Sequence, residues 1–245
     1  MLVLEEKATP LLNRTGDSYP ITMPSLSKEL ENSDAKGKEE KLAKYYHLVN
    51  DYHQIFPSRF GVDLFAKISA FFLLIEPALP ITRINEPDRS NNYPFGSFRR
   101  LYKEVGGFDL HCGNDLQRQF ELFYRELSHQ VEIKNQVSYF IVLQQAEEGG
   151  ELTTYSLPWE EGQIKMGPNE VGEDCLKLPD GSIINLHTDR RVGSESVNPQ
   201  PGDLILFQGG QLWHRVEIVK GNQDRITFGG FLGSSKASEE IILWT

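Results

Sequence analysis

The feature that most constrains the fold is a succession of short β-like segments after Pro80. Each is apolar or alternates between apolar and polar residues, and Gly, Pro, Asn and Asp, which favour turns, separate them. The segments lie at 98–103, 137–144, 152–157, 183–187, 204–207, 213–219 and 225–232. Many short strands after N-terminal helices are typical of a barrel or sandwich. The sequence therefore predicts a mainly β fold with helical support.

The part before these strands has a helical pattern. Apolar residues recur at helical spacing between residues 39 and 75, and Pro77 then ends the second helix. We expect residues 1–80 to form a helical segment packed on a β core over 81–245, with the two parts making one structural domain. Residues 159–200 are polar and contain several Gly and Pro, so we interpret them as an insertion that forms a loop or lid.

Charge and composition narrow the range of partners. The chain has 245 residues, with 25 Lys and Arg against 35 Asp and Glu, which gives a net charge of −10. This balance disfavours binding to nucleic acid or an anionic membrane through a general basic surface. Two cysteines are too few for a disulfide framework, and neither a signal peptide nor a membrane-spanning apolar run is present. We expect a cytoplasmic protein with a small-molecule substrate.

The most informative segment runs from residue 201 to residue 233. Pro-Gly-Asp makes a turn into a strand, Gly-Gly turns the chain back, and the next strand carries His214. Strand alternation places His214 and Val216 on one face, and later Arg225 and Thr227 on one face. If these faces line a barrel interior, an imidazole that suits divalent iron lies near a guanidinium that matches a carboxylate.

This order of residues resembles the C-terminal half of the iron(II)/2-oxoglutarate-dependent oxygenase superfamily. The resemblance implies a double-stranded β-helix, the jelly-roll or cupin-like fold, with supporting N-terminal helices. It also implies that His214 is the distal iron ligand, that Arg225 pairs with the far carboxylate of 2-oxoglutarate, and that Thr227 assists. The strand over 138–143 and the following Glu-Gly-Gly-Glu-Leu at 148–152 resemble the central strand and turn of this superfamily.

On the central strand, Tyr139 or Ser138 is a candidate hydrogen-bond partner of 2-oxoglutarate. Whichever of the two faces the interior is expected to make this contact, and a plain core position is the alternative for either.

The superfamily's proximal ligands are a His-x-Asp or His-x-Glu pair, and three places compete for this role. His111 comes before the central strand, where the resemblance requires it, but Gly113 stands where the carboxylate belongs. His129 also precedes that strand, in an apparent helix and with valine at the third place. His187-Thr188-Asp189 has the literal pattern, yet it follows the turn and so is out of order. We assign His111 as the proximal ligand.

A glycine at this place resembles the aliphatic halogenases of the superfamily, in which a halide takes the vacant carboxylate position. The resemblance implies halogenation, most simply chlorination, of an unactivated aliphatic C–H, with iron(II), 2-oxoglutarate, chloride and O2 as cofactors and succinate and CO2 as products. Two alternatives remain open. If Asp115 reaches the metal across a flexible Gly-Asn step, the enzyme is a hydroxylase; without metal, the barrel is a binding protein.

Substrate contacts are less specific in the sequence. Arg99 and Arg100 lie on the strand before His111, and alternation points only one of them inward, where it could hold a substrate carboxylate or phosphate. Asp115 and His187 are further candidates, the latter from the predicted lid.

Overall fold

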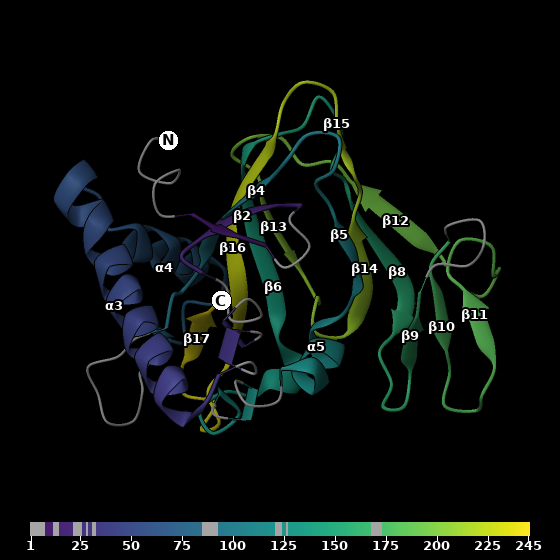
Figure 1. Ribbon diagram of the computed structural model, residues 1–245, viewed down its shortest axis with the longest axis horizontal. Helices are drawn as coiled ribbons and strands as arrows, with labels where there is room; N and C mark the ends of the chain where they lie inside the picture. Colours follow the sequence, from purple (N-terminus) through teal and green to yellow (C-terminus); the bar gives the residue numbers. More distant parts are fainter. Residues whose placement is uncertain are drawn as a thin grey trace.

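Two largely antiparallel β-sheets form the centre of the protein, and helices cover the outer face of the larger one (Figure 1). The computed structural model describes residues 8–11, 15–21, 26–27, 29–30, 33–84, 93–120, 124–125, 127–167 and 173–245. The larger sheet contains β1 (Thr9–Pro10), β2 (Gly16–Tyr19), β3 (Ile81–Arg83), β4 (Ser97–Leu101), β6 (Val137–Gln144), β13 (Leu204–Phe207), β16 (Arg225–Ser234) and β17 (Ile241–Trp244). The smaller sheet contains β5 (Phe108–His111), β8 (Leu152–Pro158), β12 (Ser194–Val197) and β14 (Leu212–Val216).

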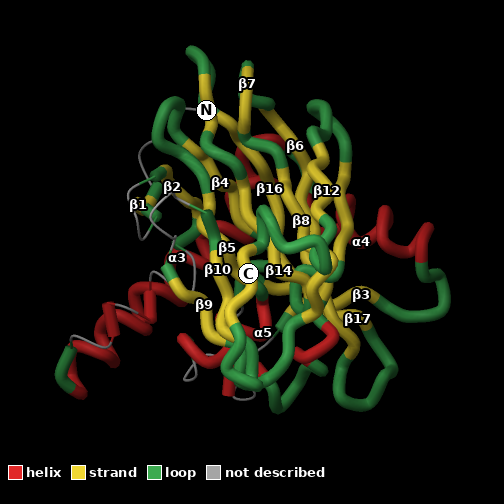
Figure 2. The backbone as a smooth tube through the Cα atoms, turned by 90° about the vertical axis from the view of Figure 1, so that its right-hand side faces the viewer, coloured by secondary structure: helices red, strands yellow, loops and turns green. Residues whose placement is uncertain are grey.

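The strand order shows the double-stranded β-helix predicted from the sequence. The run β4-β16-β6-β13 in the larger sheet stands beside the run β5-β14-β8-β12 in the smaller one. Among the eight strands of these two runs, successive strands alternate between the two sheets, apart from β8 and β12, which flank an insertion. The strand axes of both sheets are roughly aligned, so that α5 (Gly113–Gln119) lies at one end of the sheets and β7 (Glu148–Gly149) at the other (Figure 2). The interior between the sheets is therefore accessible to side chains from strands far apart in sequence.

Two N-terminal helices support the larger sheet. They are α3 (Ala35–Phe60) and α4 (Leu64–Ile75), and they agree with the helices expected between residues 39 and 75. The carboxylate of Asp63 caps α4 by accepting the backbone N–H of Ala66 at 2.9 Å. Tyr52 from α3 and Phe72 from α4 pack with Tyr139 and Phe228 of the sheet in one buried cluster. Burial of these large rings stabilises the outer face of the sheet against the helices.

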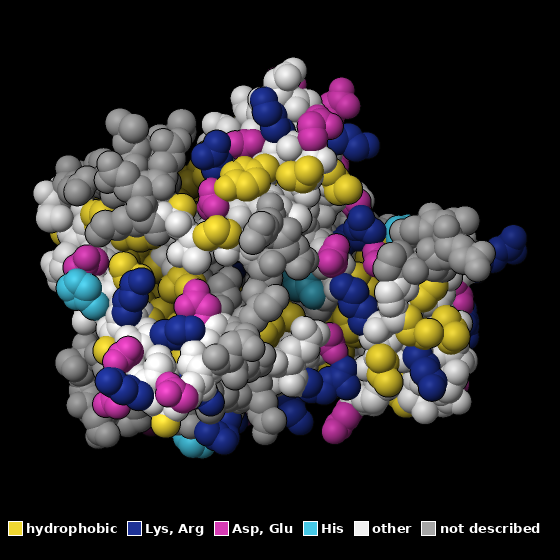
Figure 3. All heavy atoms as spheres, in the orientation of Figure 1, with side chains coloured by type: hydrophobic (Ala, Val, Ile, Leu, Met, Phe, Trp, Pro, Cys, Tyr) yellow, Lys and Arg dark blue, Asp and Glu magenta, His cyan; other side chains and the backbone are white. Residues whose placement is uncertain are grey.

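The segment between β8 and β12 forms a small three-stranded sheet, and β12 itself belongs to the barrel. The small sheet consists of β9 (Ile164–Met166), β10 (Cys175–Lys177) and β11 (Ile183–Asn185). Leu176 and Ile184 pack against Leu110 and Trp213 of the smaller barrel sheet. The other side of the small sheet exposes hydrophobic side chains, among them Ile164 and Ile183. Hydrophobic side chains are visible in this region of the molecule, at the right of Figure 3.

Two short elements complete the described structure. β15 (Val219–Lys220) pairs with β7, and the 3-10 helix η1 (Ile133–Asn135) precedes the central strand β6. Within the described residues, no helix is both long and apolar enough to cross a membrane.

Candidate functional site

A cavity of about 410 Å³ lies between the two barrel sheets. This volume is in the usual range for small-molecule sites, roughly 300–1,000 Å³. Most of its lining is apolar or aromatic, including Phe108, Phe120, Phe140, Phe207 and Phe231. Its polar lining includes two histidines and three basic side chains: His111, His214, Arg99, Lys165 and Arg225.

His111 and His214 meet inside this cavity. His111 ends β5, His214 lies in β14, and the two residues are paired across the antiparallel strands. Their ring centroids are 4.2 Å apart. Phe207 packs edge-on against the His214 ring at 4.8 Å between centroids, which fixes that ring from a third strand.

The hydrogen bonds of the two histidines leave the same nitrogen of each ring available. Nδ1 of His111 lies 2.7 Å from the carbonyl oxygen of Asp109, and Nδ1 of His214 lies 2.8 Å from that of Leu212. Because a carbonyl oxygen only accepts hydrogen bonds, each Nδ1 carries the proton and each Nε2 keeps its lone pair. Burial lowers the pKa of His111 to about 4 and also lowers the pKa of His214. Two neutral imidazoles with oriented Nδ1 protons are the form in which histidine binds a metal ion.

Arg225 brings a buried positive charge to the same cavity. It begins β16 and is 3% exposed, and its guanidinium carbon lies 5.2 Å from the centre of the Phe140 ring. Among the described residues, its Nε is buried without a hydrogen-bond partner, and Glu151 is the acidic residue whose charge acts on it. Burial lowers the pKa of Arg225 to about 10. A buried guanidinium in this state is costly unless an anionic ligand supplies the missing partner.

The Gly-Gly turn after the central strand makes room for this arginine. Gly149 and Gly150 both have positive φ angles, +69° and +71°, which other residue types rarely adopt. A Cβ atom on Gly150 would lie 2.9 Å from Cδ of Arg225. The turn motif that the sequence shows is thus needed both for its backbone and for the position of Arg225.

Gly113 opens helix α5 two residues after His111. Its N–H donates to the carbonyl oxygen of Gly209 at 2.8 Å, and this bond links the proximal histidine segment to the turn before β14. A Cβ atom on Gly113 would clash with Nε2 of Gln136. The amide of Gln136, which is 1% exposed, therefore occupies the space into which a side chain at position 113 would extend.

Asp115, the residue on which the hydroxylase alternative depends, lies in α5 and points to other partners. One of its carboxylate oxygens accepts from Arg118 and the other accepts from Nε2 of Gln119 at 2.9 Å. Asp115 does not line the cavity. In the described part of the chain, no three His, Cys, Asp or Glu side chains form a group that could hold a metal ion.

Comparison with known proteins identifies the family. Residues 34–245 match the family model of the carrier-protein-independent halogenase WelO5. The chain belongs to this family. It is accordingly an enzyme of the iron(II)/2-oxoglutarate-dependent oxygenase superfamily, as its motifs indicate. No curated protein sequence matches the chain.

Solved structures confirm the fold of the WelO5-family chain. A novel N-substituted L-amino acid dioxygenase from Burkholderia ambifaria AMMD superposes with a TM-score of 0.54 at 16% identity, covering 91% of this chain and 76% of that one. The same enzyme in complex with alpha-KG gives the same values. These structures share the jelly-roll fold expected from the sequence.

The structure brings together only some of the residues singled out in the sequence. His111, His214, Arg225, Thr227 and Arg99 all line the cavity. Tyr139 borders it, but its ring packs on Phe72 of α4 at 5.3 Å and its hydroxyl donates to the Phe95 carbonyl at 2.5 Å. Ser138 and Phe140 lie on the opposite face of β6 from Tyr139, and Phe140 faces Arg225.

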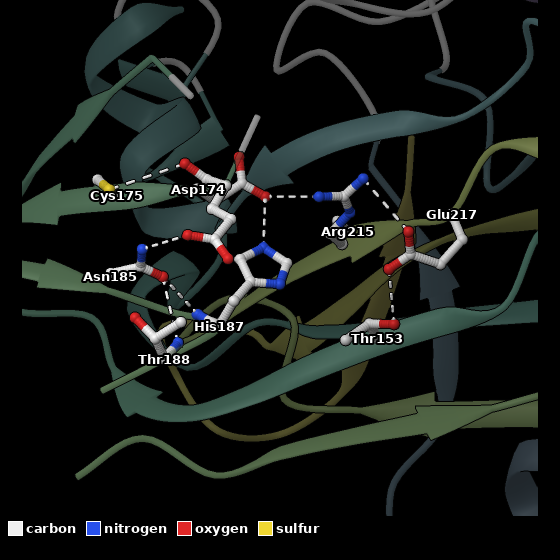
Figure 4. A network of polar contacts seen from close by, with 9 residues as sticks. Thr153, Asp174, Cys175, Asn185, His187, Thr188, Arg215 and Glu217 are labelled. Carbon is white, nitrogen blue, oxygen red and sulfur yellow. Dashed lines mark hydrogen bonds and ion pairs between the residues drawn. The ribbon is translucent and has the colours of Figure 1, made fainter. Parts of the chain in front are cut away.

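Arg100 and His187 lie away from the cavity. Arg100 points to the opposite face of β4 from Arg99 and pairs with Asp224 at 2.7 Å, as expected from strand alternation. His187 follows β11 and faces Asp174, 3.8 Å away, in a polar network outside the cavity (Figure 4). Asp174 also pairs with Arg215 at 2.7 Å, so the network links the small sheet to the strand that carries His214.

Two functional candidates were missed in the sequence. Lys165 lies in β9 and lines the cavity, and its charge contributes to the lowered pKa of His111. Gln136 precedes the central strand and lies against Gly113. A lysine in a polar insertion and a glutamine before a strand have no distinctive spacing, so only the folded contacts reveal them.

Proposed function

We propose that this enzyme halogenates an unactivated aliphatic C–H of a small molecule, with chloride as the halide. The observation that carries the proposal is that His111, one of the paired histidines, is followed two residues later by Gly113, with the amide of Gln136 where a carboxylate side chain would extend. A carboxylate and a halide compete for one anionic position on a metal. Membership of a family of carrier-protein-independent halogenases supports a small substrate that is not tethered to a carrier.

The donor set fits iron(II) and 2-oxoglutarate. His111 and His214 would hold the metal through Nε2, since their Nδ1 protons are engaged with backbone carbonyl oxygens. Arg225 would form a bidentate pair with the far carboxylate of 2-oxoglutarate, and the Thr227 hydroxyl, two residues on in the same strand, would donate to it. The ligand would then supply the anion that buried Arg225 lacks.

When bound, these cofactors supply the oxidation. One substrate C–H, 2-oxoglutarate, O2, chloride and a proton give the C–Cl product, succinate, CO2 and water. The chain's own residues bind and orient the reactants. Phe140 and Phe207 pack beside Arg225 and His214, where they exclude water from the cofactor carboxylate and the metal ligands.

The test is an anaerobic titration of the protein with iron(II) and 2-oxoglutarate, with and without chloride. We expect a visible metal-to-ligand charge-transfer band that shifts when chloride is added. A band that is indifferent to chloride would indicate a carboxylate on the metal and an oxygenase that hydroxylates. Absence of the band would contradict both assignments and leave a binding barrel.

A further inference from the structure

Arg99 is a second cavity arginine for which the proposed cofactors provide no partner. It lies in β4 directly opposite Thr227 of β16, and Arg225 is opposite Leu101, two positions along the same pair of strands. Its guanidinium carbon is 5.9 Å from the centre of the Phe108 ring. Nε contacts the Ser97 hydroxyl and Nη2 the Thr245 hydroxyl, both at 3.3 Å. These neutral contacts orient the guanidinium without compensating its charge.

The charges that line the cavity support an additional anionic ligand. Arg99, Lys165 and Arg225 line it together with a single acidic residue, Asp109, among the described residues. A divalent metal ion adds two positive charges, while 2-oxoglutarate and one halide add three negative charges. The lining then has one positive charge in excess within a largely apolar cavity. The charge of Glu151 acts on Arg225 and not on Arg99, so a ligand with one negative charge would offset the charge of Arg99.

Arg99 and Arg225 are directed to different parts of the cavity. The hydrogen bonds of Arg99 run toward Ser97 and Thr245, whereas Arg225 lies at the other end of the β4–β16 pairing, against Gly150 and Phe140. If Arg225 holds the cofactor carboxylate, the Arg99 guanidinium remains for the substrate. Phe120 and Phe231 also line the cavity and offer apolar contact area for the rest of such a ligand.

We propose that the substrate carries a carboxylate on an apolar body and that the fork of Arg99 binds this carboxylate. This inference rests on the proposed function, because it assigns to Arg225 the far carboxylate of 2-oxoglutarate. A carboxylate is favoured over a phosphate because it brings the single negative charge that the lining requires. The planar guanidinium matches it with two parallel hydrogen bonds.

The experiment measures binding to the full chain loaded with manganese(II), saturating 2-oxoglutarate and chloride, by calorimetry. The probes are phenylacetate, its neutral counterpart phenylacetamide, and phenyl phosphate. We expect phenylacetate to bind about tenfold more tightly than the amide, or better, since hydrogen bonds to charged groups are the stronger ones. The Arg99→Gln variant should reduce this ratio to near one. Arg100→Gln, on the neighbouring residue outside the cavity, is the matched control and should leave it unchanged.

Several results would overturn the inference. A ratio near one in the unaltered protein, or the same ratio in Arg99→Gln, contradicts binding of a carboxylate by Arg99. Tighter binding of phenyl phosphate than phenylacetate contradicts the choice of a carboxylate. Thermal melting checks whether Arg99→Gln folds. If it does not, the variant Arg99→Lys is used instead, which keeps the charge without the fork and should give an intermediate ratio. An undiminished ratio in Arg99→Lys contradicts the bidentate contact. Failure to bind manganese and 2-oxoglutarate at all would instead contradict the proposed function.

Discussion

His111 and His214 face each other across two hydrogen-bonded antiparallel strands, with their ring centroids 4.2 Å apart. Each donates its Nδ1 proton to a carbonyl oxygen two residues earlier in its own strand. The same local hydrogen bond therefore orients both rings. The pair is built into the rigid sheet, which is the more accurate place for a metal site than a loop.

Replacing either histidine should remove divalent metal binding. Loss of partners that only orient a ligand typically costs about 10–100-fold in metal affinity, so His111→Gln or His214→Gln should cost at least as much. The measurement is anaerobic calorimetry with iron(II) in the presence of 2-oxoglutarate. His187→Gln is the control, because His187 lies in the outer network with Asp174. Equal affinity in all three variants would contradict the assignment of the pair.

Arg225→Lys should lower the affinity for 2-oxoglutarate by roughly tenfold or more, because lysine keeps the charge but loses the bidentate fork. The guanidinium contact with the Phe140 ring would also be lost. Equilibrium binding of 2-oxoglutarate to the metal-loaded protein measures the effect. Arg100→Lys changes the same residue type on the adjacent strand, where the partner is Asp224, and should leave the affinity unchanged. An unaltered affinity in Arg225→Lys would exclude it as the anchor.

The fold and part of the site could be predicted because local patterns encode them. The strand over 137–144 appears at those bounds, and period-two alternation correctly separated Arg99 from Arg100. Strand β5, which carries His111, was not predicted. Its four residues, Phe108–His111, alternate between apolar and polar, but a run this short that contains Asp is a weak strand signal, so its pairing with β14 decides its conformation.

Contacts between distant segments could not be predicted. Tyr139 and Ser138 were equal candidates, and only the packing of α4 shows that the Tyr139 ring lies with Phe72. Likewise, the position of Gln136 against Gly113 depends on how η1 meets α5. Such contacts join residues whose spacing in the sequence carries no signal.

Gly113→Asp should abolish the effect of chloride on the charge-transfer band, but the new side chain must displace Gln136. The sharper comparison therefore uses the double variants Gly113→Asp with Gln136→Ala and Gly113→Ala with Gln136→Ala. They differ only in the carboxylate. We expect the chloride shift and chlorinated product in the double variant with Gly113→Ala, and neither in the double variant with Gly113→Asp. Chlorinated product from the double variant with Gly113→Asp would contradict the halide position.

The stability of the metal-free protein should fall with acid, and His53 of α3 should contribute to this fall together with the buried His111 and His214. Burial and the adjacent Arg83, 3.0 Å from its Nδ1, lower the pKa of His53 to about 4. Unfolded histidine titrates near 6.5, so the unfolded chain binds more protons between these values. The contribution is complete above pH 6.5 and is lost as pH falls toward 4.

The size of the His53 contribution is roughly 3 kcal/mol, from 1.36 kcal/mol per pKa unit. Denaturant unfolding at pH 7.5 and 4.5 measures it, and His53→Gln should narrow the difference between the two values. His129→Gln, at an exposed position, should leave the difference as it is. A His53→Gln difference as large as that of the unaltered protein would show that another group is responsible.

The ion pair between Asp174 and Arg215 should hold the small sheet, and with it Lys165, against the barrel. Arg215 follows His214 in β14, and its side chain is 20% exposed and that of Asp174 11% exposed. Arg215 also pairs with Glu217 at 3.2 Å, so Asp174→Asn removes only its link to the small sheet; losing this charged hydrogen bond should destabilise the attachment by about 1–3 kcal/mol. Asp189→Asn is the matched control, because its partner Arg191 is 66% exposed and such pairs contribute about 0–1 kcal/mol. Hydrogen exchange should therefore accelerate over β9, β10 and β11 in Asp174→Asn alone, with β6 and β16 unchanged. Equal exchange in the two variants would show that the hydrophobic contacts of Leu176 and Ile184 suffice to hold the small sheet on the barrel.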